Sequence, residues 1–186
     1  MNPIKNKKDL ETSIEEIRNY AYSYLERYSP SKQQLRIHLF KKVLKKKHKI
    51  YNKKELFNLI DTVISGLEND KYLSDEYYSD SKSKALLRRG YSLNKIRYSL
   101  INKGIDPEYI KSSISKIKKN ESDPDFFSAL KICQKRRIGA CREESNRNLF
   151  YKKDISILAR AGFSYEISKK VLEIPKTEFK KLIKMI

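Results

Sequence analysis

One segment of this chain occurs three times in diverged form, and its spacing limits the folds open to the sequence. The clearest copy covers residues 85–100, and it matches an earlier segment 61 positions back and a later one 72 positions forward without a gap. In the first match, Leu86, Arg88, Ser92, Ile96, Arg97 and Leu100 fall on Leu25, Arg27, Ser31, Leu35, Arg36 and Leu39. In the second, Leu86, Arg88, Gly90, Tyr91, Ser92 and Leu100 fall on Leu158, Arg160, Gly162, Phe163, Ser164 and Leu172. Each copy reads as helix, turn, helix, and a recurrence of about 60 to 70 residues indicates an α-helical repeat protein.

The fold class predicted from this pattern is all-α. Apolar residues recur at three- and four-residue spacing almost from end to end, and only five glycines and five prolines interrupt them. Units of about 60 residues bury little surface alone, so we expect them to pack on their neighbours. We predict three tandem three-helix repeats in an elongated, curved helical array. The expected parts are a flexible N-terminus (1–9), three repeats (10–70, 71–120 and 121–175) and a basic amphipathic C-terminal tail (176–186).

Several helix ends are marked by the local sequence. Ser31 followed by Gln34 forms a capping-box pattern after Pro30, and Ser92 is a second N-cap candidate. Gly90 follows a predicted helix and can adopt the left-handed conformation of a C-terminal cap. We expect glycines to serve as structural turns at three such places, Gly90, Gly104 and Gly162.

The charge of the chain is strongly positive. It has 42 Lys and Arg against 23 Asp and Glu, a formal net charge of +19. The segment 32–54 holds ten basic residues and no acid, whereas 68–80 is mainly acidic. Such a field attracts polyanions, so nucleic acid, or an assembly that contains it, is the first candidate partner. An acidic protein groove or an anionic membrane would also satisfy the charge, and some of the lysines need only solvate helix faces.

The remaining composition indicates a soluble protein of a reducing compartment. Two cysteines, Cys133 and Cys141, are too few for a disulfide scaffold. The N-terminus is polar, and no window approaches the 18 or more apolar residues of a membrane span. We therefore expect a cytoplasmic protein that does not bind a membrane, and a monomer, because repeat arrays meet their partners through an open face.

Residues that could support catalysis or bind a metal are sparse. His38 and His48 have no Cys, Asp or Glu at a ligand spacing, and no glycine-rich phosphate loop is present. Asp75, Asp80 and Asp123 with their acidic neighbours could hold magnesium in a nuclease. Their positions at the start of predicted helices favour helix capping instead. We therefore predict no metal, no cofactor and no enzymatic activity.

Basic residues that recur near the turns are better candidates for a binding surface. Arg88, Arg89 and Arg97 flank the Gly90 turn, and Lys103 ends the following helix. Together with partial equivalents in the other repeats, the candidate basic face is Arg27, Arg36, Arg88, Arg89, Arg97, Lys103, Arg136, Arg137 and Arg160. A spaced series of cations suits a filamentous polyanion, although arginines near helix C-termini also interact favourably with the helix dipole.

The 13 tyrosines suggest base stacking, but most, such as Tyr24, Tyr78 and Tyr109, fall on apolar stripes, which predicts core packing.

Two motifs of the middle repeat resemble the RecX family, whose members regulate the RecA recombinase. They are Tyr72-Leu-Ser-Asp-Glu-Tyr-Tyr78 and the later run Leu87-Arg-Arg-Gly90-Tyr-Ser-Leu-Asn-Lys-Ile96-Arg-Tyr-Ser-Leu100-Ile-Asn-Lys-Gly-Ile105. The first and last repeats are also similar to the family, so the resemblance covers about residues 10–175. Ser74 departs from the usual acidic pair, the Lys-rich segment around 45–51 lengthens the first repeat, and the tail after Pro175 is additional.

The resemblance implies a non-enzymatic modulator, expected to be an inhibitor, that binds in the groove of the RecA–single-stranded DNA filament. It would restrain filament extension, ATP turnover, and recombinase and co-protease activity, with only weak binding to single-stranded DNA alone. The alternative is a general DNA- or RNA-binding protein that does not depend on RecA. A metal-dependent nuclease is a third hypothesis, in which alanine at Asp75 and Asp123 would abolish cleavage without unfolding the chain.

Overall fold

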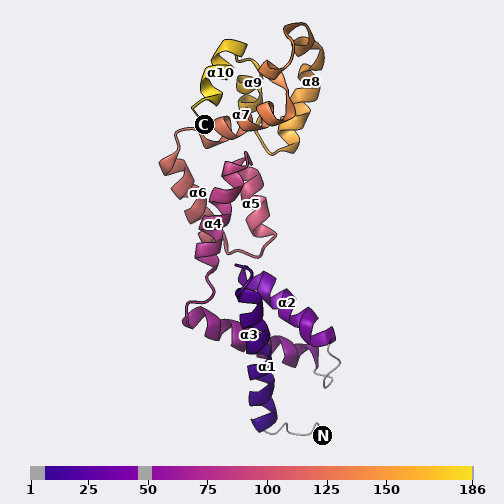
Figure 1. Cartoon of the computed structure of the whole chain (residues 1–186), viewed down its shortest axis with the longest axis vertical. Coiled ribbons are helices and arrows are strands. Elements are labelled where there is room, and N and C mark those ends of the chain that lie inside the picture. The colour runs from indigo at the N-terminus through magenta and orange to yellow at the C-terminus, as the bar shows by residue number, and fades with distance from the viewer. Residues whose placement is uncertain (1–6, 46–51, 186) are drawn as a thin grey trace. The chain divides into compact units, whose positions relative to one another are not determined.

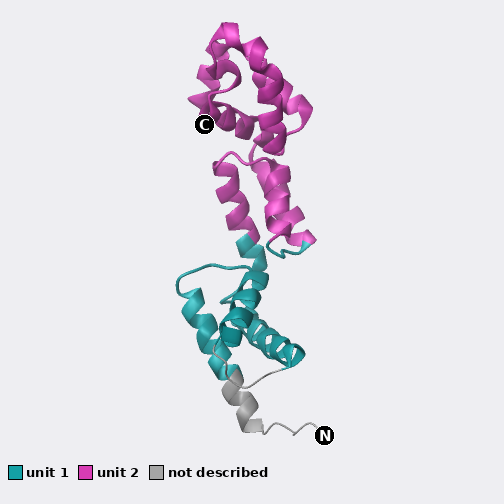
Figure 2. Ribbon diagram, turned by 90° about the vertical axis from the view of Figure 1, so that its right-hand side faces the viewer, with its two compact units in different colours: residues 1–78, 103–106 teal, residues 79–102, 107–186 magenta. Residues whose placement is uncertain are grey.

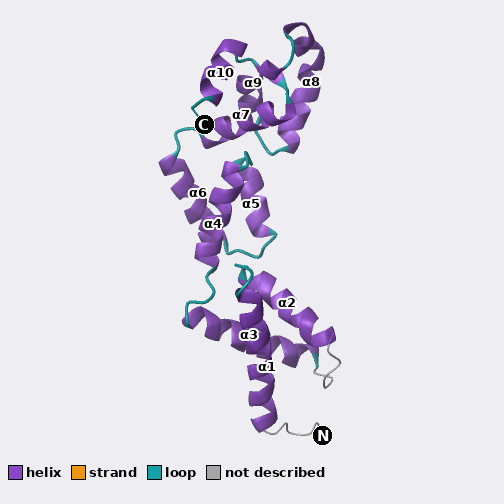
Figure 3. Ribbon diagram, in the orientation of Figure 1, coloured by secondary structure: helices purple, strands orange, loops and turns teal. Residues whose placement is uncertain are grey.

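The computed structural model describes residues 7–45 and 52–185, and in these ranges the chain contains helices and loops but no strand (Figure 3). This confirms the all-α class. The helices, labelled in Figure 1, are α1 (Lys7–Leu25), α2 (Lys32–Lys45), α3 (Lys53–Asn69), α4 (Asp75–Arg88), α5 (Leu93–Ile101), α6 (Pro107–Asn120), α7 (Pro124–Arg136), the 3₁₀ turn η1 (Gly139–Cys141), α8 (Glu144–Arg160), α9 (Tyr165–Leu172) and α10 (Lys176–Ile183). Most of the predicted flexible N-terminus and of the Lys-rich segment 45–51 lies outside the described residues. No described helix is both long and apolar enough to cross a membrane.

The chain divides into two compact units (Figure 2). The first unit comprises residues 1–78 and 103–106, and the second comprises residues 79–102 and 107–186. One boundary therefore falls inside α4, and the short loop after α5 belongs to the first unit although both neighbouring segments belong to the second. The predicted division into three repeats cuts the chain at other places and stays a prediction.

The first unit is built around an apolar cluster shared by α1, α2 and α3. Ile17 and Ala21 of α1, Leu35 and Leu39 of α2 and Ile60 of α3 are almost completely buried in it. The start of α2 follows the predicted capping box: Ser31 Oγ accepts a bond from Gln34 N (3.2 Å), and Gln34 Oε1 accepts one from Ser31 N (3.1 Å).

The second unit has its apolar cluster in α7–α10. Leu130 and Cys133 of α7, Leu158 of α8 and Val171 of α9 are fully enclosed. Phe179 of α10 is also buried in this cluster, with Leu182 and Ile183 packed beside it. The amphipathic C-terminal segment therefore docks on α7–α9 through its apolar side and presents its lysines to solvent.

Helix capping follows the sequence signals in some places and departs from them in others. Ser92, Asp123 and Ser164 cap α5, α7 and α9 through their side chains, as short polar residues do at N-termini. Asp75, however, does not cap its own helix. Ser74 Oγ accepts a bond from Tyr77 N in α4 (3.2 Å), while buried Asp75 accepts one from Lys32 N at the start of α2 (2.8 Å).

The same arrangement recurs in the second unit. Asp125 of α7 accepts a bond from Leu93 N at the start of α5 (2.7 Å). In addition, Ser31 Oγ donates to the carbonyl of Lys103 (2.7 Å), and Ser92 Oγ donates to the carbonyl of Ala161 (3.0 Å). An acid and a carbonyl from later in the chain thus complete the N-termini of both α2 and α5.

Candidate nucleic-acid interface

Most of the nine candidate basic residues are exposed, and the structure separates those that pair with acids from those that do not. Arg36 is half-buried, forms an ion pair with Asp61 (2.5 Å) and lies over the ring of Phe57, so it contributes to the packing of the first unit. The other eight form no ion pair with an acid of the described residues: Arg27, Arg88, Arg89, Arg97, Lys103, Arg136, Arg137 and Arg160. Their charges are therefore available to an external polyanion.

The Gly90 turn packs the end of α4 against α7. Gly90 has φ +83°, and a Cβ there would lie 3.2 Å from Lys131 Cβ and 3.3 Å from the Ser128 carbonyl oxygen. Glycine can adopt the left-handed conformation, and because it has no Cβ it allows the turn to approach α7 this closely. Arg89 and Tyr91, on either side of the turn, are held next to α7, and Tyr91 is exposed there rather than buried as an apolar anchor would be.

The Gly162 turn similarly joins α8 to the start of α5. Gly162 has φ +91°, and a Cβ on it would lie 2.5 Å from Ser92 Oγ and 3.4 Å from Lys95 Cβ. Arg160 is the last residue of α8, two residues before this turn. Its Nε donates to the carbonyl of Ser156 (3.2 Å), which directs the guanidinium along its own helix.

Between α7 and α8 lies a cleft of about 430 Å³ lined by Ile132, Arg136, Ile157, Arg160 and Ala161. We call it the arginine cleft. Its floor is apolar, its two charged groups are both guanidiniums, and its lining includes no acid. Arginine binds phosphate groups well because its planar fork of donors matches their geometry. The cleft thus combines features that suit a phosphodiester strand.

The sequence prediction named Arg136 and Arg160 but not the residues around them. Lys131 near Gly90 and Lys95 near Gly162 were not predicted either, because only the folded turns bring these lysines next to the two glycines. The other candidates lie elsewhere: Arg88 lines a separate cavity of about 310 Å³ with Asp80, Lys116 and Glu121. Arg97 and Arg137 are exposed outside both cavities, and Arg27 and Lys103 belong to the first unit.

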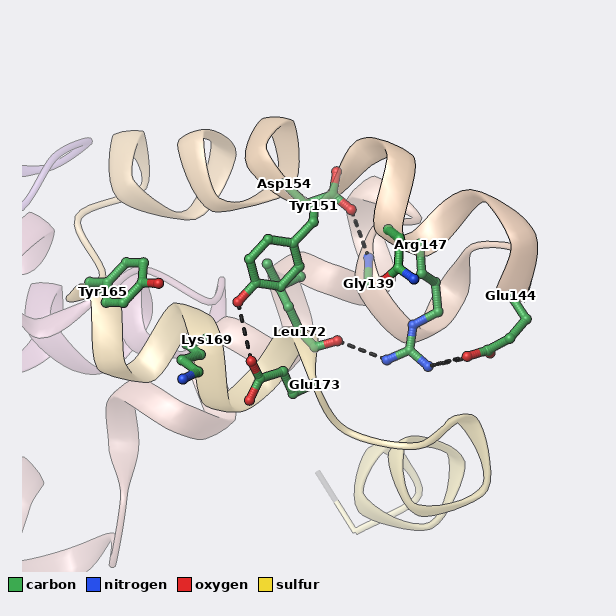
Figure 4. Close-up of a pocket in the computed structure, with 10 residues that line it drawn as sticks. Gly139, Glu144, Arg147, Tyr151, Asp154, Tyr165, Lys169, Leu172 and Glu173 are labelled. Carbon is green, nitrogen blue, oxygen red and sulfur yellow. Dashed lines mark hydrogen bonds and ion pairs between the residues drawn. The ribbon is translucent and has the colours of Figure 1, made fainter.

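A third cavity, of about 680 Å³, lies between α8 and α9 (Figure 4). Arg147 spans one end, donating to the carbonyls of Leu172 (2.8 Å) and Ile174 (2.9 Å) and pairing with Glu144 (3.1 Å). Across the cavity, Tyr151 donates to Glu173 (3.4 Å). These hydrogen bonds and the ion pair connect α8 to the α9–α10 junction. Because the polar groups already bind one another and the lining carries both positive and negative charges, the cavity is a poor site for a polyanion.

A buried carboxylate anchors the wall of the same cavity. Asp154 accepts bonds from Gly139 N (3.0 Å) and Arg142 Nε (2.8 Å), and the Arg142 guanidinium makes a second bond to it (2.7 Å). The hydrogen bonding that Arg142 donates to Asp154 is the main cause that raises the pKa of Arg142. This bidentate pair holds η1 against α8 and was not predicted from the sequence.

Groups that could take part in covalent or metal chemistry are not brought together in the described ranges. No cluster of three or more His, Cys, Asp and Glu there could hold a metal ion. The two thiols are free; burial raises the pKa of Cys133 to about 12 and also raises the pKa of Cys141. Both thiols are therefore protonated at neutral pH, which makes them poor nucleophiles.

Comparison with known proteins decides the family. No protein-family model matches the chain. The chain is, however, 30% identical over 159 residues to the regulatory protein RecX of Myxococcus xanthus (strain DK1622), covering 84% of each chain. The chain belongs to the RecX family. A Clostridium botulinum regulatory protein RecX (strain Eklund 17B) is 32% identical over 115 residues, and this match spans about half of that protein, 52%.

Two solved structures share the fold of this RecX-family chain. The crystal structure of RecX from Lactobacillus salivarius superposes with a TM-score of 0.63 at 18% identity, covering 92% of this chain and 99% of the other. A second crystal structure, of a regulatory protein RecX, gives 0.62 at 17% identity and covers 92% and 79%. These likenesses support the fold, and the family assignment rests on the sequence match.

Proposed function

We propose that this chain is a non-enzymatic regulator of RecA that binds the groove of the RecA–single-stranded DNA filament. Membership of the RecX family supports RecA as the partner. The observation that carries the proposal is the arginine cleft, because it presents two guanidiniums that no described acid neutralises, beside an apolar floor. A filament that contains DNA supplies the phosphates that such a surface attracts.

The proposed effect is inhibitory. A basic protein bound in the groove would oppose filament extension and so lower RecA's ATP turnover, recombinase and co-protease activity. We propose that Arg27, Arg88, Arg89, Arg97, Lys103, Arg136, Arg137 and Arg160 provide the contacts, with the chain acting as a cytoplasmic monomer. Arg36 is the weakest of the nine candidates, because its charge is already paired with Asp61.

The experiment is a titration of RecA, coated on single-stranded DNA with ATP, followed by ATPase rate and by anisotropy of the labelled DNA. The wild-type chain should lower both signals at substoichiometric amounts. Arg136→Glu/Arg160→Glu should weaken the inhibition at least tenfold, while leaving the thermal unfolding temperature within a few degrees of wild type. Lys180→Glu on α10 combined with Lys184→Glu at its C-cap is the control, because this pair makes the same change of net charge on exposed residues outside the cleft. Equal loss in both variants would mean that net charge, rather than the cleft, drives the effect.

The net charge of +19 also favours the alternative of a general nucleic-acid-binding protein. That alternative expects affinity for single-stranded DNA to be the same with and without RecA and to fall steeply with salt. If the wild-type chain binds DNA in this way and leaves the RecA ATPase unchanged, the proposal of a RecA regulator fails.

A further inference from the structure

Three aromatic rings form a short stack in the first unit. The His38 imidazole lies on the ring of Tyr24, with 3.9 Å between centroids and 19° between planes. Tyr24 in turn contacts Tyr28, with 4.8 Å between centroids and 37° between planes. We call His38, Tyr24 and Tyr28 the ring stack.

Local structure holds the stack in place. Tyr28 follows Tyr24 by four residues, and its N–H donates to the Tyr24 carbonyl (3.0 Å), so the helical turn continues past the end of α1. Side chains four residues apart on a helix lie on the same face. The capping box at Ser31 then starts α2, which supplies His38 from the other side.

One end of the stack is open to solvent. Tyr24 and His38 are partly buried, and Tyr24 packs against the apolar cluster of the first unit. Tyr28 is 57% exposed and is not among the residues that pack on that cluster. An exposed ring with a second ring fixed behind it is a rigid platform, and such platforms bind the faces of unpaired bases.

Cations flank the stack. Arg27 precedes Tyr28, is exposed and forms no ion pair with a described acid. Lys42 is exposed and follows His38 by four residues; burial lowers the pKa of His38, and the charge of Lys42 lowers it further. His38 is therefore neutral at physiological pH. The nearby cations are Lys42, whose Nζ lies 5.8 Å from the centroid of the Tyr20 ring, and Arg27, which precedes Tyr28 in the chain. Aromatic rings interleaved with cations are the usual means of binding single strands without sequence preference.

We propose that Tyr28 is a stacking site for a base of single-stranded nucleic acid, with Arg27 and Lys42 contacting the adjoining phosphates. The site uses no residue of the arginine cleft and does not depend on RecA as a partner. It also departs from the sequence expectation that tyrosines here serve mainly in core packing; Tyr109, expected on a buried stripe, is likewise exposed.

The absence of tryptophan from the chain allows a direct optical test. Tyr28→Trp introduces a single tryptophan at the open end of the stack, and Tyr77→Trp is the matched control. Tyr77 is 70% exposed in the same unit and belongs to no ring pair of the described residues. Each variant, as the full chain without RecA, is titrated at low salt with oligo(dT) and with an abasic deoxyribose-phosphate oligomer of the same length.

We expect oligo(dT) to quench the emission of Tyr28→Trp, and the abasic oligomer to leave it nearly unchanged while still binding. The emission of Tyr77→Trp should change with neither. By anisotropy, Tyr28→Ala should bind oligo(dT) about tenfold more weakly, an effect typical of losing one base–aromatic stack, and Tyr28→Phe should bind as wild type. Equal quenching by the abasic oligomer, or wild-type affinity of Tyr28→Ala, would overturn the proposal. Neither result would bear on the RecA titration above, which reads ATPase.

Discussion

The second unit holds its helices together in two different ways. In α7–α10 the contact is apolar, with Leu130, Cys133 and Leu158 fully enclosed. Between the first half of α4 and α6 it is polar. Ser113 Oγ donates to Asp80 (2.6 Å) and lies 2.8 Å from Ser79 Oγ, and Lys116 pairs with Asp80 (2.6 Å).

The two kinds of contact differ in how much they stabilise the fold and in how closely the contacting groups must be aligned. Burying a large apolar side chain contributes about 1.5 to 3 kcal/mol, whereas a net hydrogen bond contributes about 1 kcal/mol and requires close alignment. Helix α4 also carries a buried hydroxyl, Ser83 Oγ, with no hydrogen-bond partner in the described residues. We therefore expect α4 to open locally more often than α7–α9, and α4 is the helix that ends at Arg88, Arg89 and the Gly90 turn.

The largest expected effect tests the apolar region. Leu130→Ala should lower the free energy of unfolding by about 2 to 5 kcal/mol, because the cavity it leaves is fully enclosed. Urea unfolding followed by circular dichroism measures the change. Leu149→Ala is the control, since Leu149 is exposed on α8, and it should change stability by less than about 0.5 kcal/mol.

The polar region should be less sensitive. Ser113→Ala removes the hydroxyl that contacts Ser79 and Asp80, and should cost about 1 to 3 kcal/mol. Amide hydrogen exchange should show faster opening in α4 with little change in α7–α9. Ser115→Ala on the exposed side of α6 provides the baseline. A loss in Ser113→Ala as large as that of Leu130→Ala would contradict the comparison.

The turn that ends α4 gives a smaller effect. Gly90→Ala should destabilise the chain by about 1 to 2 kcal/mol, because an L-residue is strained at positive φ and its Cβ would press on Lys131. Gly66→Ala in α3 should instead stabilise by about 0.5 to 1 kcal/mol, since its Cβ would meet only the end of the Arg18 side chain at 3.8 Å. If Gly90→Ala is at least as stable as the wild-type chain, the Gly90 turn does not require glycine.

The smallest expected effect is a difference in how the two regions respond to pH. Burial alone would raise the pKa of Asp80, but its bonds from Lys116 and Ser113 outweigh this and lower its pKa below the ordinary value of 3.8. The unfolded chain then binds the proton first, so the stabilisation is complete above about pH 5 and is lost as the pH falls through the folded pKa. Hydrogen exchange from pH 6 to pH 3.5, corrected for intrinsic rates, should show α4 losing protection before α7. Asp80→Asn should remove this part of the pH dependence.

Local features of the fold were predictable from sequence because their causes are local. The caps at Ser31, Ser92 and Ser164 and the positive φ of Gly90, Gly104 and Gly162 are decided by residues within one turn of each position. The end of α7 could not be predicted in this way, because Arg137, which is not a glycine, adopts the left-handed conformation at its C-cap.

Contacts between distant segments were not predictable in this way. Asp75 and Asp125 resemble caps for their own helices, but they bond to Lys32 N and Leu93 N, which lie 43 and 32 residues earlier. Likewise, Arg136 and Arg160 line the same cleft only because α7 packs against α8. The internal repeat also allows two structural alignments. The Gly-aromatic-Ser turn between α4 and α5 has its equivalent between α8 and α9. The Ser and Asp hydrogen bonds at the start of α5, however, have their equivalents at the start of α2.

The bonds that complete α2 have a consequence for synthesis of the chain. The start of α2 is finished only when Asp75 and the carbonyl of Lys103 have reached it, and residues 103–106 belong to the first unit. On the ribosome, the start of α2 therefore cannot adopt its final form until residue 103 of the 186 has been synthesised, which is just over half of the chain. The first unit must wait for the middle of the chain, so its folding is timed by translation of residues that come after it.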